Sequence, residues 1–305
     1  MKHNQVTDYP MVSIIALNYN QLGVTLEFLE STKSLTYPNY EIILVDNNSN
    51  EDPTEIISEK FPEVKLIVTD KNLGFTGGNN VGIAAANGDY YFIVNNDTEV
   101  TPDLLERLLE PFEEDPNIGM VSPKIRYHVE PEVIQYAGFN KINPFTGRNS
   151  TVGQKEKDTG QYDKSGYTHY AHGAAMMVPR EVVNKVGPLP DIFFIYYEEL
   201  DWSAHIIRAG YQIYYQSKAL IFHKESITVG KDSPFKAYYH NRNRILFMRR
   251  NTTKAQFIYF LFFLVFMVVP KNIIVYTLNG QFVHLKSFFR ALAWNMNNPK
   301  YTKAY

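Results

Sequence analysis

One carboxylate follows a strongly apolar stretch in a way that suits metal chemistry. Residues 91–94 read as a buried strand, and Asn95, Asn96 and Asp97 follow it directly. The carboxyl ends of strands are where an open parallel sheet binds its ligands. A carboxylate oxygen there can hold a divalent cation, which in turn can hold phosphates. Because Asn-Asn-Asp is also an ordinary turn sequence, this segment alone is compatible with a turn or a metal site.

A second group of carboxylates suits proton transfer. Glu198, Glu199 and Asp201 lie within four residues, directly after the aromatic run 193–197. Aromatic surroundings and neighbouring like charges both raise the pKa of a carboxyl group, which suits a general base. The alternative is that these acids stabilise the start of a helix, expected over residues 202–209, through its macrodipole.

The elements that must position these groups follow a regular order in the first hundred residues. Apolar runs at 11–17, 41–45, 64–68 and 91–94 predict strands, and helices are expected between them. Strands alternating with helices are typical of a doubly wound, mostly parallel α/β sheet. Polar clusters that begin at Asn18, Asp46 and Asn95 each follow a strand, so they should gather along one edge as a nucleotide cleft.

The rest of the chain is less regular. Gly74 to Gly82 matches neither the dinucleotide fingerprint nor a Walker loop, so its glycines are expected to let a backbone approach a ligand or to pack a helix closely. Strands are expected at 118–124, 170–179 and 212–222, the last in two pieces. Residues 126–170 read as loops and short strands that could form a flap.

Composition narrows the class of protein. The chain has 305 residues, enough for one large or two modest domains, and its net charge of −2 gives no argument for nucleic acid binding. It contains no cysteine, which excludes disulfides and thiol catalysis and fits the cytosol. Residues 1–10 lack the apolar core of a signal peptide.

The composition changes near the C-terminus. Residues 257–269 are uncharged and apolar, but the run is shorter than the ~20 residues that a membrane span needs, and Pro270 interrupts it. Two short helices lying in the membrane interface therefore fit better than a span. The alternative is a helical hairpin packed on the rest of the protein or on a second subunit. The flanking cations that could meet anionic lipid are Arg249, Arg250, Lys254, Lys271, Lys286 and Arg290.

Three motifs together resemble a known family. Residues 45–49 (Val-Asp-Asn-Asn-Ser), residues 72–80 and residues 94–97 (Val-Asn-Asn-Asp) are similar to the donor-binding half of family 2 glycosyltransferases, and most of all to its bacterial rhamnosyltransferase-like branch. The resemblance implies a GT-A fold over residues 1–232, with a donor half at about 11–125 and an acceptor half at about 126–232. Residues 233–305 would then form a helical, membrane-associated region.

The same resemblance implies roles for individual residues. It makes Asp97 the main metal carboxylate, because Asn95 replaces the first acid of the usual Asp-x-Asp motif. His223 would complete the metal shell, and Glu199 would be the general base, with Asp201 and Glu198 as alternates. The implied donor-binding residues are Asn18, Asn20, Asp46, Asn48, Gly74, Asn79, Asn80, Asn95, Asn96, Asp97 and Arg242. The acceptor side would be formed by His172, Gly173, Ala174 and Trp202.

The resulting expectation is an inverting glycosyltransferase. It would use magnesium or manganese to move a sugar from a nucleotide-diphosphate donor, such as dTDP-rhamnose, to a glycan or lipid-linked acceptor for cell-surface polysaccharide. It would act at the cytoplasmic face of the membrane, and the C-terminal helices could also join subunits. The alternatives are a nucleotidyltransferase on a similar sheet and a non-catalytic sugar-binding scaffold.

Overall fold

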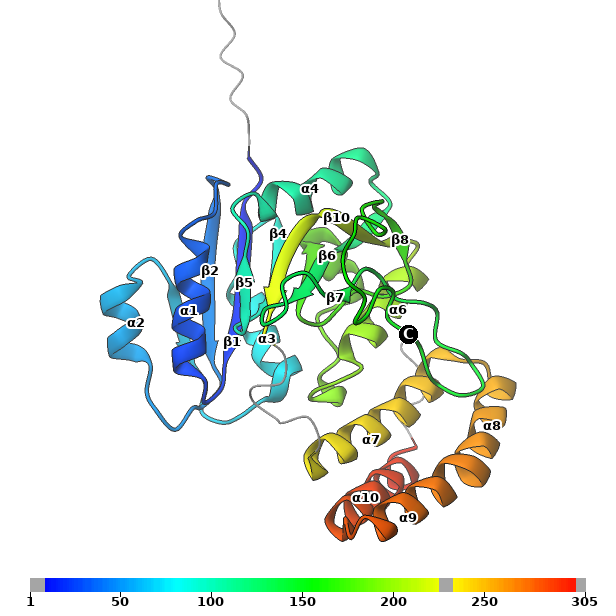
Figure 1. Cartoon of the computed structure of the whole chain (residues 1–305). Coiled ribbons are helices and arrows are strands. Elements are labelled where there is room, and N and C mark those ends of the chain that lie inside the picture. The colour runs from blue at the N-terminus through cyan, green and yellow to red at the C-terminus, as the bar shows by residue number, and fades with distance from the viewer. Residues whose placement is uncertain (1–8, 225–232, 300–305) are drawn as a thin grey trace, which may run out of the picture.

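The computed structural model describes residues 9–224 and 233–299, and a mixed ten-stranded sheet forms the centre of this part (Figure 1). The main strand order is β3-β2-β1-β4-β9-β6-β10-β5, with β7 beside β6 and β8 beside β10. The strands are β1 (Val12–Asn18), β2 (Tyr40–Asp46), β3 (Lys65–Val68), β4 (Tyr90–Asn95), β5 (Thr98–Val100), β6 (Ile118–Tyr127), β7 (Ile134–Tyr136), β8 (Gly166–Thr168), β9 (Ala175–Pro179) and β10 (Gln212–His223).

Helices cover the sheet and extend beyond it. They are α1 (Leu22–Thr32), α2 (Thr54–Lys60), α3 (Gly74–Ala85), α4 (Leu104–Glu114), α5 (Arg180–Val186), α6 (Glu198–Arg208), α7 (Pro234–Asn251), α8 (Lys254–Phe263), α9 (Val269–Leu278) and α10 (Phe282–Asn297). A short 3₁₀ helix, η1, covers Asp191–Phe193, and a π segment, η2, covers Leu264–Val268.

The parallel half of the sheet is confirmed. Strands β3, β2, β1 and β4 run parallel to one another, and β4 pairs antiparallel with β9 on its other side. Nearly continuous apolar runs fill β1, β2 and β4, as expected where helices cover both faces of a sheet. The register sets Asn18 opposite Asp46 and Leu17 opposite Asn95. The polar residues that end these strands therefore lie along one edge, as the sequence predicts.

The glycine-rich segment is helix and not loop. Helix α3 begins at Gly74, and a Cβ atom at Gly78 or Gly82 would lie 2.3 Å from a methyl carbon of Leu17 or Ile15. These two glycines let α3 pack directly on β1. Of the two expected roles, close helix packing is the one that the structure shows for Gly78 and Gly82.

Two other boundaries differ from the sequence-based expectation. Thr101 precedes Pro102, and in sequence such a threonine can cap a helix that starts with the proline. It does not cap α4, because its hydroxyl donates to the Leu220 carbonyl and the helix begins at Leu104. The two expected pieces at residues 212–222 form one strand, β10, whose pairing with β6 shifts register between Gln216 and Leu220. An irregular strand pairing weakens the alternation that makes a strand readable in sequence.

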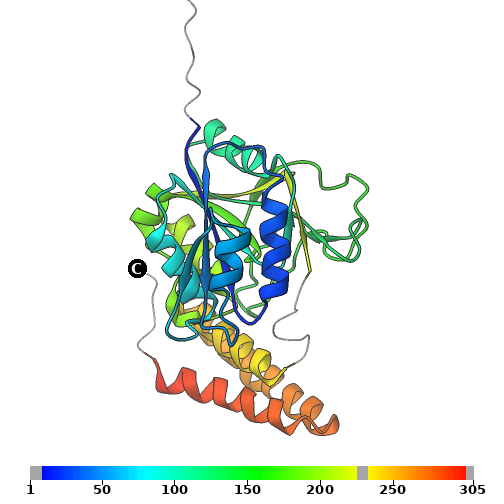
Figure 2. The ribbon, with the colours of Figure 1, turned by 90° about the vertical axis from the view of Figure 1, so that its left-hand side faces the viewer.

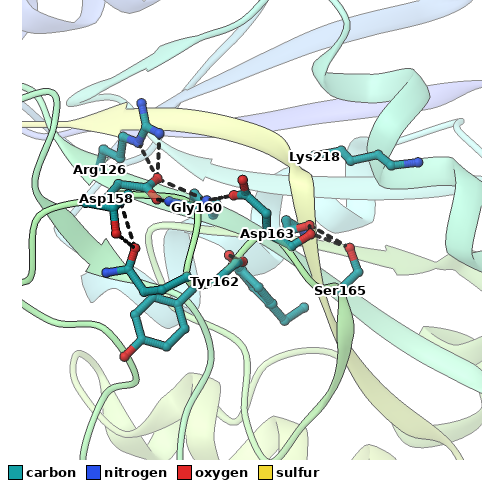
Figure 3. A network of polar contacts seen from close by, with 12 residues as sticks. Arg126, Asp158, Gly160, Tyr162, Asp163, Ser165 and Lys218 are labelled. Atoms are coloured by element: carbon teal, nitrogen blue, oxygen red, sulfur yellow. Dashed lines mark hydrogen bonds and ion pairs between the residues drawn. The ribbon is translucent and has the colours of Figure 1, made fainter.

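The segment between β6 and β9 is fastened by ion pairs, of which Lys124–Asp158 is buried (Figure 3). Lys124 on β6 donates to Asp158 at 3.0 Å and to Asp163 at 2.5 Å, and Arg126 also donates to Asp158. Burial opposes ionisation of Asp158, but hydrogen bonds from Lys124 and Arg126 lower its pKa to about 2. Ser165 donates to Gln216 on β10. The segment expected to form a flap is therefore pinned to two strands.

Helices α7 to α10 lie together on one side of the sheet (Figures 1 and 2). The expected pair of short apolar helices is wrong, because α8, η2 and α9 form one helix of 25 residues, Lys254–Leu278. Pro270 lies inside this continuous helix, and the π segment η2 directly precedes the turn that contains it. By length and composition alone this helix could cross a bilayer. The expected domain boundary near residues 230–233 falls largely on residues outside the described part.

Candidate active site

A cleft of about 780 Å³ opens at the carboxyl ends of β1, β2 and β4. Residues 95–97 and His223 line one part of it, and Gly173, Glu198 and Glu199 line another. The start of α7 closes a third side through Lys236 and His240. The cleft thus brings together the two carboxylate groups that the sequence separates by a hundred residues.

Asp97 and His223 form a pair at one end of the cleft. Nε2 of His223 lies 3.0 Å from Oδ1 of Asp97, and its Nδ1 lies 2.8 Å from the amide oxygen of Gln135. The short strand β5 pairs with β10 and so sets Thr98 opposite His223. Burial opposes ionisation of Asp97, but its contact with His223 lowers the pKa of this carboxyl below its usual value.

The donor set of this pair fits a divalent cation. Oδ1 of Asp97 is buried and, apart from His223, has no partner, so it is available as a ligand. Carboxylate oxygen and imidazole nitrogen both bind manganese, and magnesium is held by few carboxylates together with phosphate oxygens and water. Among residues 9–224 and 233–299, no group of three or more His, Cys, Asp or Glu side chains is arranged so that it could hold a metal ion. Asp97 and His223 would therefore hold a metal jointly with ligand oxygens.

The three acids at the start of α6 have different surroundings. Asp201 is buried and accepts from Arg250 at 2.9 Å and from Asn251 at 2.6 Å, so it has a structural ion pair. Glu198 and Glu199 line the cleft, and each has a buried Oε2 without a hydrogen-bond partner. Helix α6 begins at Glu198, four residues earlier than expected, so all three acids lie in its first turn.

Burial changes the acidity of the two glutamates. It raises the pKa of Glu199 to about 7, although backbone N–H groups at the helix start oppose the shift. Burial, followed by the neighbouring Glu199, raises the pKa of Glu198 well above its usual range. A carboxyl group that faces a cleft with one oxygen unpartnered and a pKa near neutrality has the properties of a general base.

The loop before α6 has a strained backbone. Phe194, Tyr196 and Tyr197 have φ values of 65°, 69° and 74°, a region that is costly for bulky residues. The side-chain amide of Asn243 on α7 donates to the carbonyls of Phe193, Ile195 and Tyr196. Such strain clusters at functional sites, where the surrounding structure over-determines it. The sequence reasoning missed Asn243, although it directly follows Arg242, for which the family resemblance implies donor binding.

Arg242 holds the same loop and does not line the cleft. Its guanidinium donates to the carbonyls of Ile192 and Phe193 and lies 4.7 Å from the rings of Tyr239 and Trp294. The donor-binding role expected for Arg242 is therefore corrected, because these carbonyls and rings hold the guanidinium and the residue does not line the cleft. Among the described residues that line the cleft, Lys236 is the lysine or arginine that could take this role.

Four predicted donor residues lie near the carboxyl ends of β1 and β2 but do not line the cleft. Asn18 is fully buried and donates to Asp46 at 2.6 Å, and Asp46 also accepts from Ser49. Asn20 and Asn48 hold left-handed backbone positions, and Asn20 accepts from the backbone of residue 50. These four residues are not among those that line the cleft, so a direct donor contact stays a prediction for them.

The asparagines of α3 are likewise committed to the fold. Asn79 donates to the carbonyl of Phe75, and Asn80 donates to the carbonyl of Leu189 and to Asp191. Gly74, Asn95 and Asn96 do line the cleft, and they are joined there by residues that the sequence reasoning missed, Tyr19, Asn47 and Asn72. Asn47 donates to Asn72 and to the Gly74 carbonyl, so it ties the end of β2 to the start of α3.

The acceptor-side prediction divides in the same way. His172, Gly173 and Ala174 line the cleft, and the side chain of Glu199 lies against Gly173. Burial, together with His223, lowers the pKa of His172 to about 3, so this imidazole is neutral. Trp202 is instead buried in the core and donates to the Gly187 carbonyl, which removes it from the acceptor surface.

Sequence comparisons relate the chain to known proteins. Residues 13–187 match the model of glycosyl transferase family 2. The chain is 23% identical over 261 residues to N-acetylglucosaminyl-diphospho-decaprenol L-rhamnosyltransferase from Mycobacterium tuberculosis. The aligned region covers 78% of this chain and 84% of that protein.

Two solved structures share the fold. The mannosyltransferase PcManGT from Pyrobaculum calidifontis, in complex with GDP-Man and Mn²⁺, aligns with a TM-score of 0.58 at 16% identity and covers 96% of this chain and 76% of that one. GalNAc-T7 with UDP, GalNAc and Mn²⁺ aligns with a TM-score of 0.63 at 15% identity, over 79% of this chain and 48% of that one. The GT-A fold expected from the sequence is confirmed.

Proposed function

Because this chain belongs to glycosyl transferase family 2, we propose that it is an inverting enzyme that moves a sugar from a nucleotide-diphosphate donor to a glycan or lipid-linked acceptor. One observation carries the proposal: the cleft holds the Asp97–His223 pair and the unpartnered carboxyl of Glu199 together. The pair suits a metal-bound diphosphate, and the carboxyl group suits a hydroxyl that must lose a proton.

In the proposed reaction, the acceptor oxygen attacks the anomeric carbon of the donor sugar. The new C–O bond forms as the bond from this carbon to the diphosphate breaks, so the configuration inverts. The proton of the acceptor hydroxyl passes to Glu199, and the nucleoside diphosphate leaves. A magnesium or manganese ion held by Asp97 and His223 would neutralise charge on the leaving diphosphate. Lys236 would add a positive charge on the α7 side of the cleft.

The finer features of the substrates belong to the same proposal. The relative from Mycobacterium tuberculosis is named for rhamnose transfer to a lipid-linked sugar. We therefore propose dTDP-rhamnose as the first donor to test and a polyprenyl-linked saccharide as the acceptor, in cell-surface polysaccharide synthesis at the cytoplasmic face of the membrane. The donor would bind in the half formed by residues 11–125, and the acceptor in the half formed by 126–232.

The scaffold alternative predicts a cleft without reactive groups. A non-catalytic protein gains nothing from burying two carboxyl oxygens without partners, since each costs free energy. Glu198 and Glu199 therefore favour an enzyme.

The test of the metal assignment is a binding titration. Asp97→Ala should abolish the manganese dependence of nucleoside-diphosphate binding, measured calorimetrically with dTDP, UDP and GDP, while the melting temperature stays within a few degrees. Asp115→Asn is the matched control, because this acid lies just before the amino end of β6, at the opposite edge of the sheet. Manganese-dependent affinity that survives Asp97→Ala would refute the metal role of this residue.

A further inference from the structure

We propose that helices α8 to α10 form a one-sided platform that lies in the headgroup region of a bilayer containing anionic lipid, without crossing it. This inference makes the proposed membrane location specific: it names the lipid chemistry, the contact residues and the depth. It rests on the proposed function only for the reason why the enzyme would need a membrane, and its tests read binding and topology instead of catalysis.

The platform exposes large apolar side chains on consecutive helices. Nine of them are between 57% and 81% exposed, and they include Tyr259, Phe262, Phe266, Leu278, Phe282 and Val283. Only 17% of the most apolar stretch of the 25-residue helix is buried in the protein, and α9 has no buried residue. A contiguous apolar surface of this kind marks an interaction site.

The charge of the chain identifies the partner. After Asp232 the sequence contains 11 lysines and arginines and no Asp or Glu, whereas residues 1–232 contain 19 basic and 32 acidic residues. The near-neutral net charge of the chain is therefore the sum of a strongly basic C-terminal tail and an acidic body, residues 1–232. Lys254, Lys271, Lys286 and Arg290 are exposed beside the apolar side chains, and none of the described salt bridges involves them.

Cations beside an exposed apolar face are the signature of an interfacial helix on anionic lipid. A second copy of this chain would set the same basic surface against itself, because a two-fold interface uses the same patch on both partners. The like charges would then oppose association. A bilayer with anionic headgroups supplies the complementary charge and the apolar depth together.

Packing on one face of the helix argues against a span. Phe260, Leu264 and Val268, spaced four residues apart, are buried in one cluster with Phe193 and Leu200 of the α6 region. A helix through the bilayer would either break these contacts or draw the body of the protein into hydrocarbon.

Charged groups lie along the same buried side. The guanidinium groups of Arg244 and Arg148 lie 5.7 Å from the rings of Phe260 and Phe263. Burying such groups in a membrane is costly. The helix therefore lies along the surface, with one side on protein and the other toward lipid.

The platform and the cleft belong to one rigid unit. Helix α7 presents Lys236 and His240 to the cleft, and α10 returns to pack on α7, where the Asn295 amide donates to the Arg242 carbonyl at 2.9 Å. Phe145, which is 50% exposed, lies edge-on to Tyr259 and extends the apolar surface to the loop before β8. A lipid-linked acceptor could thus keep its chain in the bilayer while its head group enters the cleft.

The first experiment measures binding of the full chain to vesicles of pure phosphatidylcholine and of phosphatidylcholine mixed with phosphatidylglycerol. We expect binding to the mixed vesicles and release by high salt. The triple variant Lys271→Glu, Lys286→Glu, Arg290→Glu should bind at least about a hundredfold more weakly. The matched control reverses three exposed lysines of the acidic body: Lys60→Glu, Lys164→Glu, Lys218→Glu. Equal loss in both triple variants would overturn the assignment of this surface.

An apolar variant separates lipid from protein partners. Phe262→Ser with Phe266→Ser alters exposed side chains only, so it should fold normally and lose vesicle binding. Sedimentation velocity without vesicles should show a monomer for both proteins. A wild-type dimer that dissociates in this variant, combined with no vesicle binding, would show that a second copy covers the face and would refute the proposal.

The absence of cysteine permits a direct test of depth. Asn279→Cys places a single thiol in the turn after α9, and Lys60→Cys places one on α2 as a control. When the protein is added to preformed vesicles, a membrane-impermeant maleimide should label both sites. Protection of position 279 until detergent is added would show that the helix spans the bilayer. Failure of catalysis with every sugar donor would leave these results unchanged, so the two proposals fail separately.

Discussion

At the residue scale, the three acids of α6 illustrate how surroundings assign roles to similar side chains. Asp201 has Arg250 and Asn251 as partners, whereas Glu198 and Glu199 each keep a buried oxygen unpaired. A buried oxygen without a partner costs free energy in the free protein and is satisfied only when a ligand arrives. The unpaired carboxyls therefore mark where a substrate hydroxyl would bind.

Glu199→Gln tests the base. It keeps the shape of the side chain and removes the proton acceptor, so kcat should fall about 10²–10⁴-fold while nucleoside-diphosphate affinity is unchanged. Asp201→Ala is the contrasting variant, because an unpaired Arg250 should cost about 3–5 kcal/mol in the free energy of unfolding. Steady-state kinetics and denaturant unfolding separate the two effects. A Glu199→Gln enzyme with near wild-type kcat would move the role to Glu198.

The raised pKa of Glu199 predicts a pH dependence. The reactive form is the carboxylate, so kcat/KM should rise with pH and level off above about 7. Stability should change in the opposite direction, because the folded protein retains a proton that the unfolded chain loses above about 4.5. The contribution of Glu199 to stability is therefore lost as pH rises from about 4.5 to 7. Glu199→Gln should make this slope shallower without abolishing it, because the pKa of Glu198 is also raised, and unfolding curves across that range would show the change.

At the element scale, helix α7 has two roles: it holds the loop before α6, and its amino-terminal turns line the cleft. One face holds the loop over residues 192–196 through Arg242 and Asn243, and its first turns present Lys236 and His240 to the cleft. His240 stacks on Tyr196 with ring centroids 4.2 Å apart. Burial, followed by Lys236, lowers the pKa of His240 to about 4, so this ring is neutral and Lys236 carries the charge.

A pair of substitutions on α7 separates holding from binding. Arg242→Met removes the side-chain donor of the Ile192 carbonyl, whereas the Phe193 carbonyl keeps its hydrogen bond from Asn243, so the free energy of unfolding should fall by about 1–3 kcal/mol if the Ile192 carbonyl stays buried. Lys236→Met should leave the melting temperature unchanged and weaken nucleoside-diphosphate binding about tenfold or more. Thermal denaturation and calorimetry distinguish these outcomes. If Arg242→Met weakened binding without loss of stability, the diphosphate contact first expected for Arg242 would be restored.

At the scale of the whole molecule, the C-terminal helices are part of the folded body. Ile245, Leu246 and Phe247 of α7 are buried in one cluster with Phe193 and Leu200. The basic tail and the acidic body are also linked directly by the Arg250–Asp201 ion pair. The protein therefore combines a GT-A sheet with a helical layer. This layer completes the cleft and also forms the apolar outer face of the protein.

A truncated chain that ends at residue 232 should lose cooperative folding. The truncation would expose this apolar cluster and remove Arg250, the ion-pair partner of Asp201. Denaturant unfolding should therefore lose its single sharp transition. A chain that ends at residue 299 is the control and should unfold like the full protein. A stable, soluble and cooperative 1–232 fragment would show that the helices are an accessory and not part of the core.

What the sequence determined by itself was local in origin. The apolar runs of β1, β2 and β4 and the polar residues that end them predicted a parallel sheet edge, and Asp97 and Glu199 were placed on the cleft correctly. Strand alternation, turn chemistry and acid clusters are properties of short windows, so they can be recognised without the fold.

Only the tertiary structure decided which polar groups already have partners. Arg242 lies about fifty residues from the carbonyls that it holds, and Asp201 lies as far from Arg250. Such pairings depend on how α7 packs against the loop before α6, and no local pattern encodes that packing. The continuity of α8 with α9 past Pro270 was settled in the same way, because contacts along one face of the helix can offset the local cost of a proline and a π segment.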